Sequence, residues 1–199
     1  MYNKGSRGGY ELFVRALPCA DTPWVCSVKI FYLKRFTMAA VHESMKLISF
    51  LIGRWHGTGE GILPHGPSFK YEENLVIEDI GQPNFAYSAT SFIDGVTRHR
   101  ESGFIKCHED SQVLLCLADN LGTCSILLGP VEVKSERTKL LLTSCSITRA
   151  PFNREPHVVE VVRDYMYDGE RLHLVVRLST TRNSELSDHL QITYKRELD

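Results

Sequence analysis

Residues 53–61 alternate between two kinds of position with a strict period of two. Gly53, Trp55, Gly57, Gly59 and Gly61 occupy every second position, and alternate residues of a β-strand project from the same face. Glycine weakens the interior of a strand, so its repetition on one face indicates a bend, a bulge, or the close approach of a backbone or a ligand. We interpret this stretch as the first strand of a small β-barrel that curves over something flat or bulky. A glycine-rich loop is the alternative.

Beyond residue 61, short apolar or alternating stretches recur at hairpin spacing. The Asp94-Gly95 and Asp168-Gly169 dipeptides are strong hairpin signals, and Gly129-Pro130 is typical of a further turn. The expected strands cover residues 69–80, 85–93, 99–107, 113–118, 123–128, 131–133, 139–148, 158–167, 172–181 and 189–195. Roughly ten meandering strands predict an all-β fold, an antiparallel up-and-down barrel that removes its own edges by closing. A two-sheet sandwich is the alternative.

Residues 41–52 have a helical pattern, with Met45, Ile48 and either Leu51 or Ile52 on one side. We expect a short helix here that closes one end of the barrel and stops before Gly53.

Residues 1–40 show no sustained period of either kind. We expect them to form an N-terminal extension of uncertain structure, ahead of a barrel domain at residues 41–199. Met38 is an alternative start of the chain.

Length, charge and cysteine spacing restrict the number of domains, the expected partners and the expected cellular compartment. The 199 residues suit one all-β domain with a tail. A net charge of -1 disfavours nucleic acid or a membrane surface as an electrostatic partner. No apolar run is long enough to span a bilayer, and the first residues have no secretory signal pattern. The six cysteines lack CxxC spacing, so we expect buried free thiols in a reducing compartment, the cytoplasm or the nucleus.

The Gly-x-Trp-x-Gly-x-Gly-x-Gly pattern at residues 53–61 resembles in full the signature of the nitrobindins, small heme-binding β-barrels similar in architecture to lipocalins and fatty-acid-binding proteins. Similar blocks follow at residues 67–73, 99–104, 155–158, 177–181 and 189–190. The resemblance covers about residues 47–197, and the last two blocks are most similar to the animal branch. Animal members often carry a zinc-dependent THAP DNA-binding domain, whose Cys/His ligand pattern is not present here.

The resemblance implies that His189 is the axial ligand of the heme iron, because it occupies the position of the family's ligating histidine. A neutral imidazole is a good iron ligand. Without the resemblance, a lone histidine at the start of a strand is more often exposed or capped. Alternation places His189 on the face opposite Leu190 and Ile192, and a bulge or a position at the mouth of the barrel would reconcile the two observations.

Other pocket residues are implied by the same resemblance. Arg163 matches an arginine associated with heme binding, where a guanidinium would pair with the propionates; a surface cation is the alternative. His65 stands where the family usually has a heme-contacting threonine. Arg98, His99 and Leu178 correspond to positions on the open side of the heme. Asp119 is expected near them, although solvent-exposed rim residues would fit the polar ones equally well.

The approach to His189 departs from the family pattern. Residues 182–188 form a loop that is one residue longer and lacks two prolines, which predicts a more mobile loop and a lower heme affinity.

The resemblance implies one ferric heme b per chain, which binds nitric oxide and isomerises peroxynitrite to nitrate and so limits tyrosine nitration. The expected partners are these small molecules, with no nucleic acid or membrane, and the chain is expected to be a monomer or homodimer. The alternatives are a β-barrel carrier of a fatty acid or other small apolar ligand, and a heme-free interaction domain.

Overall fold

The computed structural model describes residues 40–62, 67–108 and 110–197. The expected extension, apart from Ala40, and the candidate residue His65 therefore lie outside the described residues. No helix in the described part of the chain is long and apolar enough to cross a bilayer.

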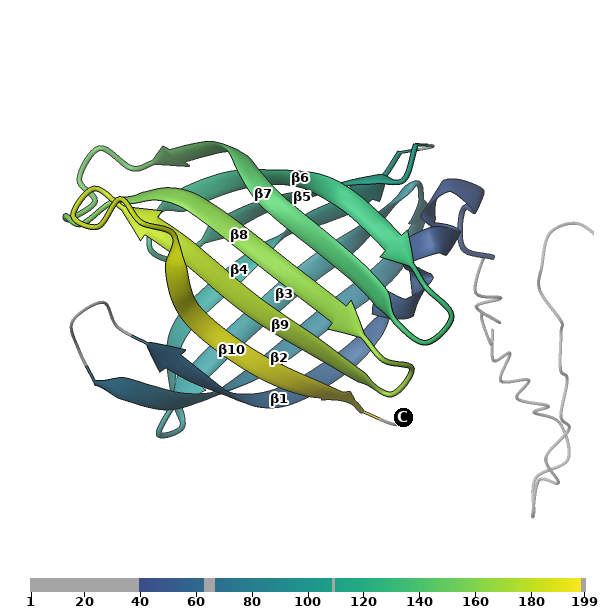
Figure 1. Cartoon of the computed structure of the whole chain (residues 1–199), viewed down its shortest axis with the longest axis horizontal. Coiled ribbons are helices and arrows are strands. Elements are labelled where there is room, and N and C mark those ends of the chain that lie inside the picture. Colours follow the sequence, from purple (N-terminus) through teal and green to yellow (C-terminus); the bar gives the residue numbers. More distant parts are fainter. Residues whose placement is uncertain (1–39, 63–66, 109, 198–199) are drawn as a thin grey trace, which may run out of the picture. The chain divides into compact units, whose positions relative to one another are not determined.

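Ten antiparallel strands form one closed barrel, in which each strand pairs with its neighbours in the sequence and β1 pairs with β10 (Figure 1). This architecture confirms the predicted up-and-down barrel, and the alternative of a two-sheet sandwich is wrong. The strands are β1 Gly53–Ile62, β2 Ser68–Gln82, β3 Asn84–Ile93, β4 Val96–Cys107, β5 Gln112–Asp119, β6 Thr123–Val133, β7 Thr138–Arg149, β8 Val158–Tyr167, β9 Arg171–Thr180 and β10 Ser187–Arg196.

The predicted helix is present as the 3₁₀-helix η1, Glu43–Leu51. Its three buried residues, Met45, Ile48 and Leu51, are spaced by three, which matches the three-residue turn of a 3₁₀-helix better than the 3.6-residue turn of an α-helix. All three belong to the hydrophobic core, and η1 closes one end of the barrel as expected (Figure 1). Because the strands run up and down, the odd-numbered strands end and the even-numbered strands begin at the opposite end.

The glycines of β1 face the barrel interior, and neighbouring protein atoms rather than an open space lie against them. A Cβ atom at Gly59 would lie 2.5 Å from the carbonyl oxygen of Gln191 and 2.7 Å from the ring of Tyr71. A Cβ atom at Gly61 would likewise clash with the ring of Phe69, the cross-strand partner of Gly61 on β2. The bulky objects over which β1 curves are therefore two aromatic rings of β2 and the backbone of β10.

Trp55, which shares this inner face, belongs to the closed end of the barrel. Its Nε1–H donates a hydrogen bond of 2.9 Å to the backbone carbonyl of Leu51, and the guanidinium of Arg196 lies 4.4 Å from its ring centroid. Trp55 therefore anchors η1 to the barrel.

The predicted turn at Gly129-Pro130 is wrong, because both residues lie within β6. They pair with β5 but interrupt the pairing with β7 between Leu128 and Val131. The missing N–H of Pro130 therefore falls where the β6–β7 ladder has no pair, which explains why a strand tolerates it.

The expectation of buried thiols is correct for Cys107 and wrong for three other cysteines. Cys116, Cys124 and Cys145 are free and exposed. Cys19 and Cys26 lie outside the described residues.

Candidate functional site

A cavity of about 340 Å³ lies inside the barrel toward the end opposite η1. Leu121, in the β5–β6 turn, and Val158, at the start of β8, contribute to its lining at that end. Most of the remaining wall is apolar, as is usual for a ligand pocket, and includes Phe69, Ile93, Leu117, Val161, Val176, Leu178 and Leu190.

The cavity brings together every candidate pocket residue that the structure describes, whereas the signature residues of β1 do not line it. His65 lies outside the described residues, so its role stays a prediction. The candidates that line the cavity are Arg98, His99, Asp119, Arg163, Leu178 and His189.

A bulge in β10 directs His189 to the cavity. Asp188 pairs with Arg177 and Leu190 pairs with Val176, so His189 is an extra residue opposite consecutive residues of β9. The strict alternation is broken at this point, and His189 and Leu190 both line the cavity. Of the two explanations offered for the position of His189, a bulge or a place at the mouth of the barrel, the bulge is present.

The imidazole of His189 is oriented by the backbone of β1. Its Nδ1 atom lies 3.0 Å from the carbonyl oxygen of Ile62. A carbonyl only accepts hydrogen bonds, so Nδ1 carries the proton and donates it, and Nε2 of the neutral ring keeps its lone pair. Burial lowers the pKa of His189, against the opposing effect of the Ile62 carbonyl, and so favours this neutral form. A half-buried, neutral histidine whose Nε2 has no hydrogen-bond partner among the described residues fits the requirement of a heme iron for an axial ligand.

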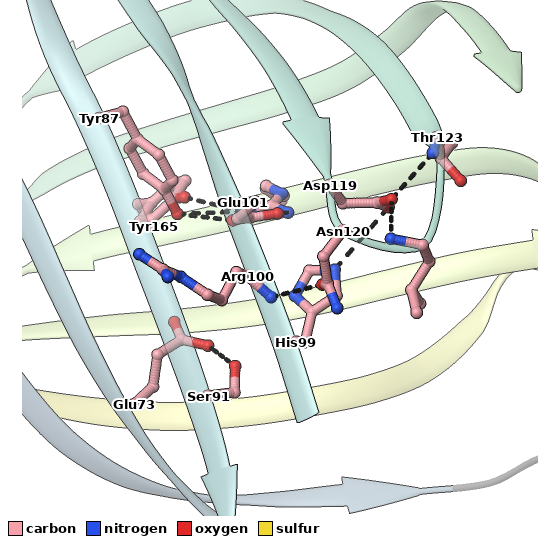
Figure 2. Close-up of polar contacts among 12 residues, drawn as sticks. Glu73, Tyr87, Ser91, His99, Arg100, Glu101, Asp119, Asn120, Thr123 and Tyr165 are labelled. Atoms are coloured by element: carbon pink, nitrogen blue, oxygen red, sulfur yellow. Dashed lines mark hydrogen bonds and ion pairs between the residues drawn. The ribbon is translucent and has the colours of Figure 1, made fainter. Parts of the chain in front are cut away.

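Arg163 lines the inner part of the cavity, where it is already paired. Its Nη1 and Nη2 atoms donate to the two carboxylate oxygens of Glu101, at 2.7 and 2.6 Å. The hydroxyl of Tyr87 donates a further bond of 2.8 Å to Glu101 (Figure 2). The side chains of Arg163 and Glu101 are 12% and 7% exposed, so the alternative interpretation of Arg163 as a surface cation is wrong.

The ion pair keeps both groups charged inside the barrel. Burial alone would raise the pKa of Glu101, but the charge and hydrogen bonds of Arg163 outweigh it, and the pKa is lowered. The Nε atom of Arg163 is buried and has no hydrogen-bond partner among the described residues. The contact between Arg163 and heme propionates stays a prediction, and such a contact would have to compete with Glu101.

A second buried carboxylate, Glu73, lies near this pair and was missed by the sequence reasoning. The hydroxyl of Tyr194 donates to it at 2.5 Å, and the hydroxyl of Ser91 donates to its other oxygen (Figure 2 shows the Ser91 contact). Burial raises the pKa of Glu73, because the two hydroxyls compensate only part of the lost hydration. The signal was present in the sequence, since Glu73 shares its alternating face with Tyr71 and Leu75.

His99 and Asp119 lie together at the mouth of the cavity, as expected. His99 Nε2 is 3.8 Å from Asp119 Oδ2, an ion-pair distance (Figure 2). The other carboxylate oxygen, Oδ1, accepts backbone hydrogen bonds from Leu121 and Thr123, at 2.9 and 2.8 Å. Arg98 is exposed beside them and forms no ion pair with any described residue.

The loop before His189 is held by contacts with the β7–β8 connection. The Thr181 hydroxyl donates to the carboxylate of Glu155, and His157 Nε2 lies 3.1 Å from the other oxygen of that carboxylate. Thr180 Oγ1 accepts from the backbone N–H of Asn183 at 3.1 Å. These bonds restrain a segment that lacks prolines. The greater mobility of residues 182–188 stays a prediction.

Comparison with known proteins places this barrel among relatives. The family model for the THAP4-like heme-binding β-barrel domain matches residues 44–196. Among curated relatives, the peroxynitrite isomerase THAP4 of Rattus norvegicus is 33% identical over 167 residues, which cover 78% of this chain. A peroxynitrite isomerase Rv2717c of Arabidopsis thaliana is 31% identical over 153 residues, which cover 76% of this chain and 87% of the relative.

The chain corresponds to only 28% of the length of the rat protein that it matches. A solved structure of comparable extent, Rv2717c from M. tuberculosis, aligns with a TM-score of 0.74 and 27% sequence identity. The alignment covers 79% of this chain and 99% of the mycobacterial one.

Proposed function

The chain belongs to the family of THAP4-like heme-binding β-barrel domains, the nitrobindins, and from this premise we propose that it binds one ferric heme b through Nε2 of His189. The observation that carries the proposal is the hydrogen bond from His189 Nδ1 to the Ile62 carbonyl, because it fixes the tautomer that leaves Nε2 free. The mostly apolar cavity that His189 lines suits a large, flat and mostly apolar cofactor.

We further propose that the protein binds nitric oxide and isomerises peroxynitrite to nitrate. The proposal is supported by the peroxynitrite isomerase names of its relatives. When bound, the heme supplies a Lewis acid that coordinates nitrogen oxides. His189 would hold the cofactor, Leu178 and Val176 would keep bulk water from its face, and Arg98 at the mouth would attract its propionates or an incoming anion.

The decisive experiment is a titration of the purified protein with hemin, followed by absorption spectroscopy. A Soret band that saturates at one equivalent is expected. Stopped-flow mixing of the loaded protein with peroxynitrite should then show accelerated decay, with nitrate as the main product. The absence of a Soret band would overturn the cofactor assignment, and a normal Soret band without accelerated decay would overturn the activity alone.

A carrier of fatty acids is less consistent with the interior. A carboxylate ligand inside a barrel needs a cation to compensate its charge, and the charge of Arg163 is already paired with Glu101 through Nη1 and Nη2. The second carboxylate, Glu73, would add repulsion if ionised. Co-purified lipid without a Soret band would nevertheless favour the carrier, and the absence of both would favour the heme-free interaction domain.

A further inference from the structure

The mouth of the cavity contains a histidine, His99, that lies at ion-pair distance from an aspartate, Asp119. Asp119 is immobilised because its Oδ1 accepts the backbone N–H groups of Leu121 and Thr123, which leaves Oδ2 directed toward His99 Nε2. A carboxylate in this position favours the proton on Nε2. The other ring nitrogen, Nδ1, has no hydrogen-bond partner among the described residues, and His99 lines the cavity.

The charges around His99 favour its protonated form. Burial acts to lower the pKa of His99, but the carboxylates of Asp119 and Glu101 outweigh burial and raise it, even though the guanidinium of Arg163 opposes them. His189, on β10, and Arg98, next to His99 in the chain, complete the titratable and charged groups on this part of the cavity lining. The pKa values of His99 and His189 are therefore shifted in opposite directions, since the pKa of His189 is lowered.

We propose that His99, positioned by Asp119, is a recognition residue for small nitrogen oxyanions at the mouth of the cavity. The protonated ring donates a hydrogen bond from Nδ1 to an oxygen of the anion, while Nε2–H faces Asp119. The proton stays on the ring, so the interaction is binding and requires no covalent step. The inference rests on the proposed function, which supplies peroxynitrite as the anion, and it assigns to His99 a role in substrate capture.

The physical reasons are charge and geometry. An apolar cavity penalises an entering anion, because it offers no replacement for lost hydration. Two cationic groups at the entrance, Arg98 and protonated His99, offset this penalty and raise the local concentration of anions. His99 differs from Arg98 in that its charge disappears as pH rises, so anion binding should weaken with pH over the range in which His99 titrates.

Nitrite is a stable probe for this test, and the hemin-loaded full chain is the protein to use. Nitrite affinity is measured from the absorption spectrum between about pH 5 and pH 8. His99→Phe should lower the affinity at the acidic end about tenfold, the value of one charge-assisted hydrogen bond. His99→Gln keeps a donor without a titrating charge, so the affinity should become nearly independent of pH. His173→Gln is the matched control, because His173 forms a similar pair with Asp168, at 3.3 Å, outside this cavity.

A second measurement uses the protein without hemin. The ring signals of His99, followed by NMR, should titrate above the ordinary histidine pKa, and Asp119→Asn should lower the midpoint by about one pH unit. The amide oxygen that this substitution introduces can still accept the two turn hydrogen bonds, so the fold is preserved. An unchanged nitrite affinity in His99→Phe, or a His99 midpoint at or below the ordinary value, would overturn the inference.

The two proposals can fail separately. If hemin did not bind at all, the proposed function would fail, and the NMR response of His99 to nitrite in the heme-free protein would decide the present inference. A nitrite-dependent shift of the His99 signals that is reduced in Asp119→Asn and retained in His173→Gln would support it; no shift in the unaltered protein would refute it.

Discussion

Arg163 and Glu101 form a bidentate ion pair inside the barrel, although they are 62 positions apart in the chain. The pair joins β8 to β4 across the interior, so it connects strands that are not neighbours in the sheet. A buried ion pair contributes little net stability, but removing one partner leaves an uncompensated charge in an apolar environment.

We therefore expect Glu101→Gln to lower the free energy of unfolding by about 3–5 kcal/mol. The glutamine preserves the shape and can still accept from Tyr87, so the loss would report the charge rather than a cavity. Urea denaturation measures it. Asp164→Asn, which breaks the more exposed pair between Asp164 and Lys139 on the outer surface, should cost about 1 kcal/mol or less. Equal effects of the two substitutions would contradict this account.

Much of the barrel is predictable because the side chains of each strand alternate between the inner and the outer face. The alternation in β1 assigns Trp55, Gly57 and Gly59 to the inner face, and all three are buried. Alternation defines a face but not a partner, so the closing register between β1 and β10, in which Trp55 pairs with Arg196, could not be derived. The turn placed at Gly129-Pro130 failed for the same reason, since only the pairing with β5 shows that the strand continues there.

The site was less predictable from local pattern. His189 was proposed through a family resemblance against its own alternation, and the bulge that resolves the conflict depends on pairing with β9. Glu73 and Glu101 carried a usable signal, because each is a charged residue on an otherwise apolar inner face. Their partners were not predictable, since Arg163 and Tyr194 meet them only when the barrel closes.

Glu73 should make stability fall as pH rises above its ordinary pKa of 4.5. Burial raises the pKa of Glu73 in the folded protein, so between the ordinary and the raised value the folded state holds a proton that the unfolded chain has lost. Below pH 4.5 the proton on Glu73 makes its full contribution to the free energy of unfolding. Above pH 4.5 this contribution declines by up to about 1.4 kcal/mol per pH unit, until the raised pKa of Glu73 is reached.

Glu73→Gln mimics the protonated form and should remove this decline, so the variant should be more stable than the unaltered protein at neutral pH. Urea unfolding at several pH values measures the difference. Glu72→Gln, on the exposed face of the same strand, is the control for the loss of a carboxylate. If the two variants followed the same pH curve, Glu73 would not be the group responsible.

The glycines of β1 should be more sensitive to substitution than the residue between them. A Cβ atom at Gly57 or Gly59 would lie 2.7 or 2.5 Å from a backbone carbonyl oxygen of β10. Because backbone cannot move aside as a flexible side chain can, Gly57→Val or Gly59→Val should destabilise by about 1–3 kcal/mol or more, and hemin binding should suffer as well.

Thr58→Val, on the exposed face of the same strand, should be nearly neutral because a β-branched residue suits a strand. Thermal unfolding and hemin titration of the three variants test the assignment of faces. Equally mild effects at all three positions would refute it.

The last prediction concerns the axial ligand. His189→Ala should abolish or strongly shift the Soret band of the hemin-loaded protein and suppress peroxynitrite isomerisation. The barrel should remain folded, because His189 is only half-buried at a bulge near the start of β10 and contributes little to the core. The circular dichroism spectrum and the urea midpoint of the heme-free variant verify folding independently of the cofactor.

His65 and His99 are the competing ligands, and His65→Ala and His99→Ala are the matched variants. His99 is engaged with Asp119 at the mouth, and the raised pKa of His99 favours a protonated ring that cannot bind iron. We therefore expect the Soret band to survive in His99→Ala and to be lost only in His189→Ala. If instead the spectrum were unchanged in His189→Ala and lost in His65→Ala or His99→Ala, the axial assignment would be wrong, and the heme would be held by a reorganised site.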